Sequence, residues 1–370
     1  MKFTFDKDAV LKETAIAQEI ISTKNAISIL SNVLLSAKNN SLTIKATDVK
    51  VNFETKIPVD VQEEGSTTIF CDKFISILNS LPPGEIEFAQ DDIAVTIKPA
   101  AKKVKFQLKS MASEKFPDFS LGEPQAYFDV PARDFKEMIA QTIFSISDDE
   151  TRYFMNGAYF EKKDDDLIVV ATDGRRLSYI AKPLCQGVEA FAPVIVPPKI
   201  LNIILKRAPS EGNISLAIAD KMIYFRFGSY QFSSALIDAQ FPNYQRVIPE
   251  NQTQYFEIDK GDLTDALKRV GLLVEQKTRR IYFEVKPGVL TISARESDIG
   301  NADEDIPCQY DGEPVKMALN YLYLEEPVKV IEASRIRFEF TEAMKAVTMR
   351  PEPATDFFHI IMPMQTAEGI

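Results

Sequence analysis

The sequence carries an internal repeat with a period of about 125 residues. The heptapeptide ATDGRRL at 171–177 is echoed as ATDVKVN at 46–52 and, more faintly, as ARESDIG at 294–300. A repeat of this length is the size of a domain, so it constrains the fold more than any local pattern does. We therefore expect three tandem domains, over residues 1–122, 123–250 and 251–370.

Two further signals keep the same period. A short apolar segment opens each unit, and an acidic segment that favours helix follows it. A Phe-Pro motif then recurs near the end of the first two units. The opening segments are Lys2-Phe3-Thr4-Phe5, Tyr127-Phe128-Asp129-Val130 and Tyr255-Phe256-Glu257-Ile258, and the motifs lie at 114–119 and 239–244.

The periodicity of apolar residues predicts an α+β fold. In the second unit, helical spacing runs from Phe135 to Ile146. Apolar and polar residues alternate over 335–340, as in a half-buried antiparallel strand. Each repeat should pack two helices against antiparallel sheet, and sheets of adjacent repeats can join edge to edge into a continuous arc. The second helix of each unit is expected over 72–81, 197–206 and 318–325.

Composition indicates a globular protein of the cytoplasm. Hydrophobic residues make up 45% and charged residues 26% of the 370 residues, which is typical of soluble proteins. We find no apolar run close to the roughly 20 residues that a membrane helix needs. The start, MKFTFDKDAV, lacks the basic-then-apolar pattern of a signal peptide.

The few cysteines and the single histidine argue against a catalytic or metal centre. Cys71, Cys185 and Cys308 are odd in number and far apart, which favours small buried thiols over a disulfide framework. His359 is the only histidine and lies in the apolar segment FFHIIM. A zinc site or a Ser-His-Asp triad is therefore improbable. We expect no cofactor and no enzymatic activity.

The net charge of −11 bears on nucleic-acid binding. A sequence-specific DNA-binding protein is usually basic on one face, so this charge argues against that class. It is compatible with a protein that repels DNA on its outside and concentrates Lys and Arg on one surface.

The three repeats together with three motifs resemble the sliding clamp family, the β subunit of bacterial DNA polymerase III. The motifs are ATDGRRL at 171–177, FPNYQRVIP at 241–249 and HIIMPMQ at 359–365. The resemblance covers the whole chain. It implies a non-catalytic processivity factor, half of a homodimeric ring that encircles duplex DNA. It also implies that the replicative polymerase, the clamp loader, repair polymerases and other proteins bind through a short peptide motif, with no membrane partner.

The dimensions of helices support a ring of two chains. If two helices about 10 Å wide from each domain line the hole, one chain gives a hole of about 9 Å. That is too narrow for a duplex, whose major groove alone is about 12 Å wide. Two chains give a hole of roughly 28 Å, which admits DNA and water. Closure by two heterologous ends would also leave no free sheet edge.

The resemblance implies a peptide groove between the second and third domains. Apolar side chains and methionines suit varied partners, and Gly174 lets a backbone approach closely. Without the resemblance, Asp173-Gly174 would be interpreted as a hairpin turn and Met362-Pro363-Met364 as a chain end. Gln365 stands where many members carry a basic residue. The matching residues are Met155, Thr172, Gly174, Arg175, Arg176, Leu177, Pro242, Arg246, Val247, Ile360, Met362, Pro363 and Met364.

The resemblance also implies DNA contacts. Lys and Arg hold phosphates without reading sequence, and an aromatic ring can stack on an exposed base. Asp149 and Glu150 depart from the polar or neutral contact that many members place there. The alternative is that these groups are solvated surface residues. The expected contacts are Lys24, Lys73, Arg152, Tyr153 and Lys199.

The resemblance further implies a dimer seam that places Phe106 and Leu108 of one chain against Leu272 and Leu273 of the other. Opposite charges flank the two ends and would favour head-to-tail pairing. A Lys-rich protected edge strand is the alternative for the first end. The flanking charges are Lys102, Lys103 and Lys105 on one side and Asp298, Asp303, Glu304 and Asp305 on the other.

Two other classes of function remain open from the sequence. Asp164, Asp165, Asp166 and Asp173 could bind a hard cation in an enzyme, although the first three are better interpreted as a polar turn. A repeat scaffold could also present a peptide groove without binding DNA. Retention on circular but not on linear plasmid would distinguish a clamp from such a scaffold.

Overall fold

The computed structural model describes residues 1–370 apart from 22–27, 92, 120, 122–126, 298 and 366–370. The described chain forms two compact units. Unit 1 holds a 13-stranded sheet and unit 2 a 12-stranded sheet, and neighbouring strands in both sheets pair antiparallel. Unit 1 is Met1–Ala132 with Asn202–Leu236, and unit 2 is Arg133–Leu201 with Ile237–Ile370.

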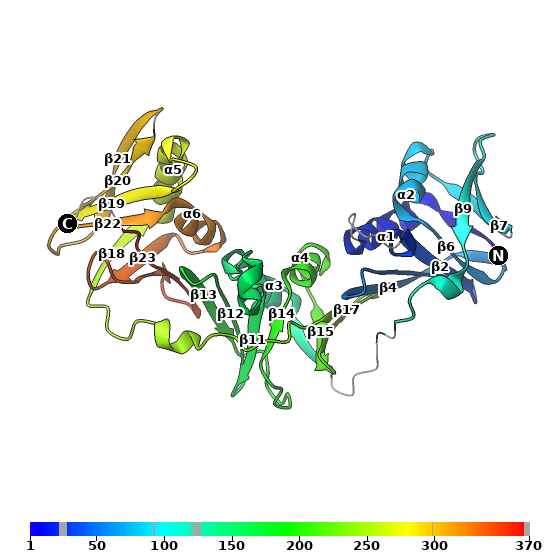
Figure 1. The fold of residues 1–370 in the computed structure, drawn as a ribbon, viewed down its shortest axis with the longest axis horizontal. Coiled ribbons are helices and arrows are strands. Elements are labelled where there is room, and N and C mark those ends of the chain that lie inside the picture. Colours follow the sequence, from blue (N-terminus) through cyan, green and yellow to red (C-terminus); the bar gives the residue numbers. More distant parts are fainter. Residues whose placement is uncertain (22–27, 92, 120, 122–126, 298, 366–370) are drawn as a thin grey trace. The chain divides into compact units, whose positions relative to one another are not determined.

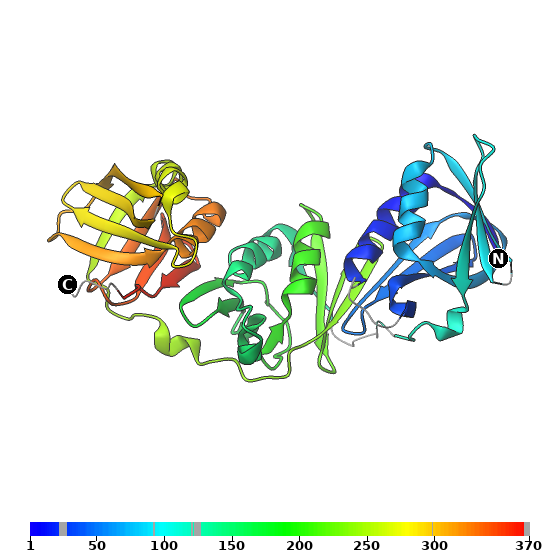
Figure 2. The same ribbon diagram turned by 45° about the horizontal axis from the view of Figure 1, so that its top comes forward.

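The first repeat packs two helices on one face of its strands. Helices α1 (Lys7–Ile20) and α2 (Cys71–Ser80) lie side by side in both ribbon views (Figures 1 and 2). Asp6 caps α1 by accepting the Ala9 N–H at 3.0 Å. The strands are β1 (Lys2–Asp6), β2 (Asn32–Lys38), β3 (Ser41–Thr47), β4 (Val51–Pro58), β5 (Asp60–Glu63), β6 (Gly65–Phe70), β7 (Glu85–Asp91), β8 (Ala94–Pro99) and β9 (Phe106–Met111).

The middle repeat is shared between the two units. Its strands β10 and β15 to β17 extend the sheet of unit 1, where β17 pairs with β4. Its strands β11 to β14 belong to unit 2, where β13 pairs with β25 of the third repeat. Sheets therefore continue from one repeat into the next, edge to edge as predicted. The elements are β10 (Phe128–Pro131), α3 (Ala132–Ala140), β11 (Ala158–Lys163), β12 (Asp166–Thr172), β13 (Arg176–Lys182), β14 (Val194–Val196), α4 (Pro198–Arg207), β15 (Asn213–Ala219), β16 (Met222–Phe227) and β17 (Tyr230–Ala235).

The third repeat again has two helices against antiparallel strands, which confirms the predicted α+β class. Asp259 caps helix α5 (Lys260–Val270) by accepting the N–H groups of Gly261 and Asp262 at 2.7 and 3.1 Å. Helix α6 (Tyr321–Val330) packs against α5. The strands are β18 (Gln254–Asp259), β19 (Arg280–Lys286), β20 (Val289–Ser297), β21 (Gly300–Gln309), β22 (Val315–Asn320), β23 (Arg335–Phe340), β24 (Val347–Glu352) and β25 (Phe357–Ile361).

Phenylalanine dominates the cores between helices and sheet. In the first repeat Phe3 stacks on Phe88 with ring centroids 4.8 Å apart. In the third repeat Phe256 stacks on Phe338 at 4.7 Å. All four rings are fully buried, so the opening strand of each of these repeats contributes an aromatic ring to its core. The alternation predicted over 335–340 is confirmed in β23.

Two predicted helices have different ends in the structure. The helix expected from Phe135 to Ile146 ends at Ala140, where the Thr142 hydroxyl donates to the Met138 carbonyl at 2.8 Å. The run expected over 318–325 was wrong at its start, since residues 318–320 belong to β22. Helix α6 begins later because the Asn320 side chain accepts the Leu322 N–H at 3.0 Å.

The cysteine prediction is confirmed, since all three thiols are free and buried. Burial raises the pKa of Cys71 to about 12 and that of Cys185 to about 11, so both thiols stay protonated. A helix long and apolar enough to cross a membrane does not occur in the described part of the chain. Within the same residues, no three His, Cys, Asp or Glu side chains are grouped so as to hold a metal ion.

Candidate functional site

The turn between β12 and β13 is locked by its own side chains. The Asp173 carboxylate accepts the N–H groups of Arg175 and Arg176 at 2.9 and 3.1 Å. The Thr172 hydroxyl accepts the Gly174 N–H at 3.1 Å and donates to the Arg176 carbonyl at 2.6 Å. Such local bonds fix the turn without help from distant residues.

Two features of this turn favour glycine at position 174. Its φ of +85° lies in the left-handed region. A Cβ atom there would also lie 2.9 Å from a guanidinium nitrogen of Arg152 and 3.9 Å from the Met155 methyl. Met155 is buried at the end of the 3-10 helix η4 (Glu150–Met155). The turn therefore packs tightly against η4.

The segment after β25 is tied to this turn. The Met362 N–H donates to the Arg175 carbonyl at 2.9 Å, and the Met364 N–H donates to the Ala318 carbonyl of β22 at 2.8 Å. These bonds hold the chain end in place while 46% of Met362 stays exposed. The sequence motif HIIMPMQ thus continues from a buried strand into an ordered, accessible segment.

A cavity of about 460 Å³ opens beside this segment. It brings together Arg175, Met362, Pro363 and Met364 of the predicted groove. The two methionines, the proline and a tyrosine give the lining its apolar part, and two arginines also line the cavity. The prediction did not include Arg280, Asn320 and Tyr323 in the groove, and Gln365, where it noted a departure from the family, also lines the cavity.

Arg176 lies behind the cavity wall, and its side chain is only 9% exposed. Its Nε donates to Asp173 Oδ2 at 3.1 Å. Its other two nitrogens donate to the Glu326 carboxylate and the Phe144 carbonyl. The guanidinium carbon lies 4.4 Å from the centroid of the Tyr323 ring. The sequence predicts that Arg176 lines the groove. In the structure it belongs to this turn, but its side chain contacts residues of the protein and does not line the cavity.

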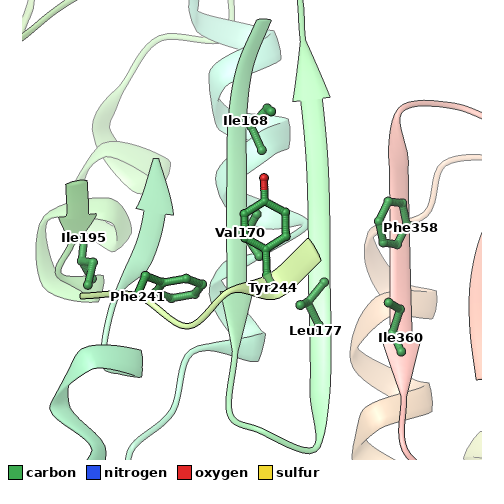
Figure 3. Close-up of a cluster of buried hydrophobic side chains, with 8 residues drawn as sticks. All are labelled: Ile168, Val170, Leu177, Ile195, Phe241, Tyr244, Phe358 and Ile360. Atoms are coloured by element: carbon green, nitrogen blue, oxygen red, sulfur yellow. The ribbon is translucent and has the colours of Figure 1, made fainter. Parts of the chain in front are cut away.

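Two other predicted groove residues belong to a buried apolar cluster next to the turn (Figure 3). Leu177 on β13 pairs with Ile360 on β25, and both are 3% exposed. Tyr244 packs in the same cluster and donates to the Glu161 carboxylate at 2.9 Å. Pro242 comes just before Tyr244, which begins the 3-10 helix η5 (Tyr244–Val247), where Arg246 and Val247 are exposed.

His359 lies in a closed polar network. Its Nδ1 is 2.7 Å from the Ser178 hydroxyl, which is 2.8 Å from the Ser145 hydroxyl. All three side chains are fully buried. Desolvation, reinforced by the positive charge of Arg176, lowers the pKa of His359 to about 3. This serine and histidine pair cannot meet a substrate from solvent, so it is structural.

The predicted DNA contacts differ in their surroundings. Lys73 is exposed on α2, and Tyr153 is 55% exposed with its ring 6.1 Å from that of Phe154. Arg152 forms an ion pair with Asp149 at 2.8 Å, which offsets part of its positive charge. Lys199 is partly buried in the first turn of α4. Lys24 lies outside the described residues.

The predicted seam residues occupy two segments, one in each unit. Phe106 and Leu108 are half-buried on β9. Leu272 is 81% exposed in the 3-10 helix η6 (Gly271–Leu273), and Leu273 is partly buried. Asp298 lies outside the described residues. The flanking Lys102, Lys103, Lys105, Asp303 and Asp305 are exposed, and Glu304 pairs with Arg269.

A repeated α+β domain, sheets that continue between repeats, and an apolar cavity without reactive groups define the class of DNA clamps. Models of the DNA polymerase III beta subunit match its N-terminal domain to residues 1–120, its central domain to 129–243 and its C-terminal domain to 245–365. The chain belongs to the DNA polymerase III beta subunit family, the bacterial sliding clamps.

Relatives match along the whole chain. The beta sliding clamp of Treponema pallidum is 48% identical over 370 residues, covering 99% of this chain and 100% of the relative. That of Escherichia coli K12 is 26% identical over 368 residues, with coverage of 99% and 100%. The crystal structure of the Bartonella birtlesii sliding clamp bound to griselimycin has a TM-score of 0.94 at 28% identity, covering 99% and 100% of the two chains.

The family assigns the function predicted from the sequence. The protein is a processivity factor of DNA polymerase III with no catalytic activity of its own. It acts as a homodimeric ring around duplex DNA and tethers the polymerase and other partners. The alternatives of an enzyme and of a scaffold that does not bind DNA are thereby excluded.

Proposed function

We propose that the cavity beside Met362 is the site where this clamp captures the short peptides of its partners. The observation that carries the proposal is an apolar opening of about 460 Å³ whose floor is fixed by hydrogen bonds from Met362 and Met364. A pre-formed site of this kind loses little entropy when a flexible peptide binds. The polymerase, the loader and repair polymerases would therefore compete for one place.

The chemistry of the lining supports a hydrophobic anchor on the peptide. Two methionines and a tyrosine adapt to aliphatic and aromatic side chains alike. Leu177 and Ile360 support the wall from behind, and Val247 adds an exposed apolar side chain on η5. We retain all thirteen predicted groove residues as parts of this site, whether they line the cavity or support its wall, and add Arg280, Asn320 and Tyr323.

Truncating both methionines tests the site. In full-length protein, Met362→Ala with Met364→Ala should abolish binding of a fluorescein-labelled peptide from the replicative polymerase, measured by anisotropy. Sedimentation should still give the dimer. Met222→Ala, on β16 of unit 1, is the control for loss of a methionine and should bind normally. Unchanged peptide affinity in the double variant would refute the assignment.

We also propose the remaining assignments made from the sequence. Lys24, Lys73, Arg152, Tyr153 and Lys199 contact DNA, and Phe106 and Leu108 meet Leu272 and Leu273 across the seam. The exposure of Lys73, Tyr153 and Leu272 supports these roles. The domains span 1–122, 123–250 and 251–370, and the protein works in the cytoplasm.

A further inference from the structure

The guanidinium of Arg176 is buried, and each of its nitrogens has a hydrogen-bond partner within the protein. Each of its three nitrogens donates to an acceptor, namely Asp173, Glu326 or the Phe144 carbonyl. Its carbon lies 4.4 Å from the ring centroid of Tyr323 and 5.7 Å from that of Phe144. Two of its five N–H groups remain, but the side chain is only 9% exposed, so a peptide has little access to them.

Tyr323 connects this buried arginine to the cavity. Its ring packs on the guanidinium and also lines the cavity. Glu326 follows three residues later on α6, so both side chains lie on the same side of that helix. The ion pair between Arg176 and Glu326 therefore holds α6 against the β12–β13 turn, with the tyrosine ring in contact with the arginine.

We propose that Glu326 is a positioning residue of the peptide site. Through Arg176 it fixes the Tyr323 ring as a wall of the cavity, and it does not touch the peptide itself. The inference rests on the proposed peptide site and adds Glu326 as a residue that maintains the shape of the cavity. It also reassigns Arg176 from peptide contact to support, because each of its nitrogens already donates within the protein and its side chain is only 9% exposed.

Removing the charge of Glu326 tests this role. Glu326→Gln in the full-length protein should weaken binding of the labelled polymerase peptide about tenfold, because it removes a charged hydrogen bond to the buried Arg176 guanidinium. Glu325→Gln is the matched control, since it is the neighbouring residue on α6 and pairs with Lys329 at 3.0 Å. The control should bind normally. Glu326→Asp keeps the charge and should recover part of the affinity.

A double-mutant cycle separates positioning from general destabilisation. If Glu326 acts through the tyrosine, Glu326→Gln should cause no further loss of affinity in a Tyr323→Ala background. An equal loss in both backgrounds, or the same loss in Glu325→Gln, would overturn the inference. Should Glu326→Gln unfold, shown by its thermal transition, the cycle is run with Glu326→Asp and judged by the same criterion.

The outcome also distinguishes this inference from the proposed site. If Met362→Ala with Met364→Ala abolishes binding while Glu326→Gln has normal affinity, only the role of Glu326 is wrong. If the methionine variant binds normally, the peptide site itself lies elsewhere.

Discussion

At the residue scale, the echo between the first two repeats is a repeated turn. Asp48 accepts the N–H groups of Lys50 and Val51 at 3.0 and 2.7 Å, and the Val49 N–H donates to the Thr47 hydroxyl at 2.9 Å. These bonds match those of the turn at 172–176. The sequence ATDVKVN therefore encodes the same backbone path as ATDGRRL, but with valine in place of glycine.

Val49 carries the strain that Gly174 avoids. Its φ is +81°, where a β-branched residue is rarely found, and its side chain is 66% exposed. Val49→Gly should raise the free energy of unfolding by about 0.5–1 kcal/mol, because relief of strain exceeds the added entropy of glycine in the unfolded chain. Urea unfolding measures the change.

The reverse substitution provides the comparison. Gly174→Val should destabilise the protein by about as much as Val49→Gly stabilises it, because φ is +85° at Gly174 and +81° at Val49, and the Arg152 guanidinium that a Cβ atom would meet can move aside. A Val49→Gly variant that is less stable than the wild type would contradict the strain argument.

At the element scale, local patterns predicted much of the fold. Alternation in 335–340 and the helix expected over 72–81 mark elements that the structure contains, as β23 and α2. The split of the middle repeat between two sheets had no local signal, because the pairing of β17 with β4 joins residues far apart in the chain. Tyr323 and Arg280 could not be predicted from the sequence for the same reason. They line one cavity with Arg175, which lies far away in the sequence.

The same backbone hydrogen bond recurs where the sheet of one repeat joins the sheet of the next, and no local sequence pattern predicts it. At the end of β17 the Ala235 N–H donates to the Lys50 carbonyl at 2.8 Å, and after β25 the Met362 N–H donates to the Arg175 carbonyl at 2.9 Å. In both places the last residue of a strand, or the residue after it, donates to the turn of the preceding repeat. In the second place the donor is Met362, so the bond that connects the two repeats also positions a residue of the proposed peptide site.

The dimer seam offers the prediction at this scale. Leu272 and Leu273 form a short exposed helix end beside β21. Leu273→Asp should give monomers in sedimentation, because a charge would be buried in an apolar contact without a partner. Lys277→Asp, which changes charge on a nearby exposed residue, is the control and should stay dimeric. A persistent Leu273→Asp dimer would count against this seam.

At the scale of the whole molecule, net charge and DNA binding have to be reconciled. With a charge of −11 per chain, open contact with a polyanion is repulsive except where Lys and Arg gather. Phosphate contacts of that kind are weak and fall steeply with salt. A clamp therefore cannot depend on affinity to stay on DNA, and its retention has to come from closure around the duplex.

Retention should accordingly depend on the topology of the DNA and only weakly on salt. Clamp loaded on a nicked circular plasmid should remain bound in gel filtration at both low and high salt, because no bond has to hold it. Cutting the circle with a restriction enzyme should release it, since the ring slides off the ends. The Leu273→Asp variant cannot close and should bind circular and linear DNA alike, weakly and only at low salt. Equal retention of wild-type protein on both forms would mean that affinity and not encirclement holds the clamp.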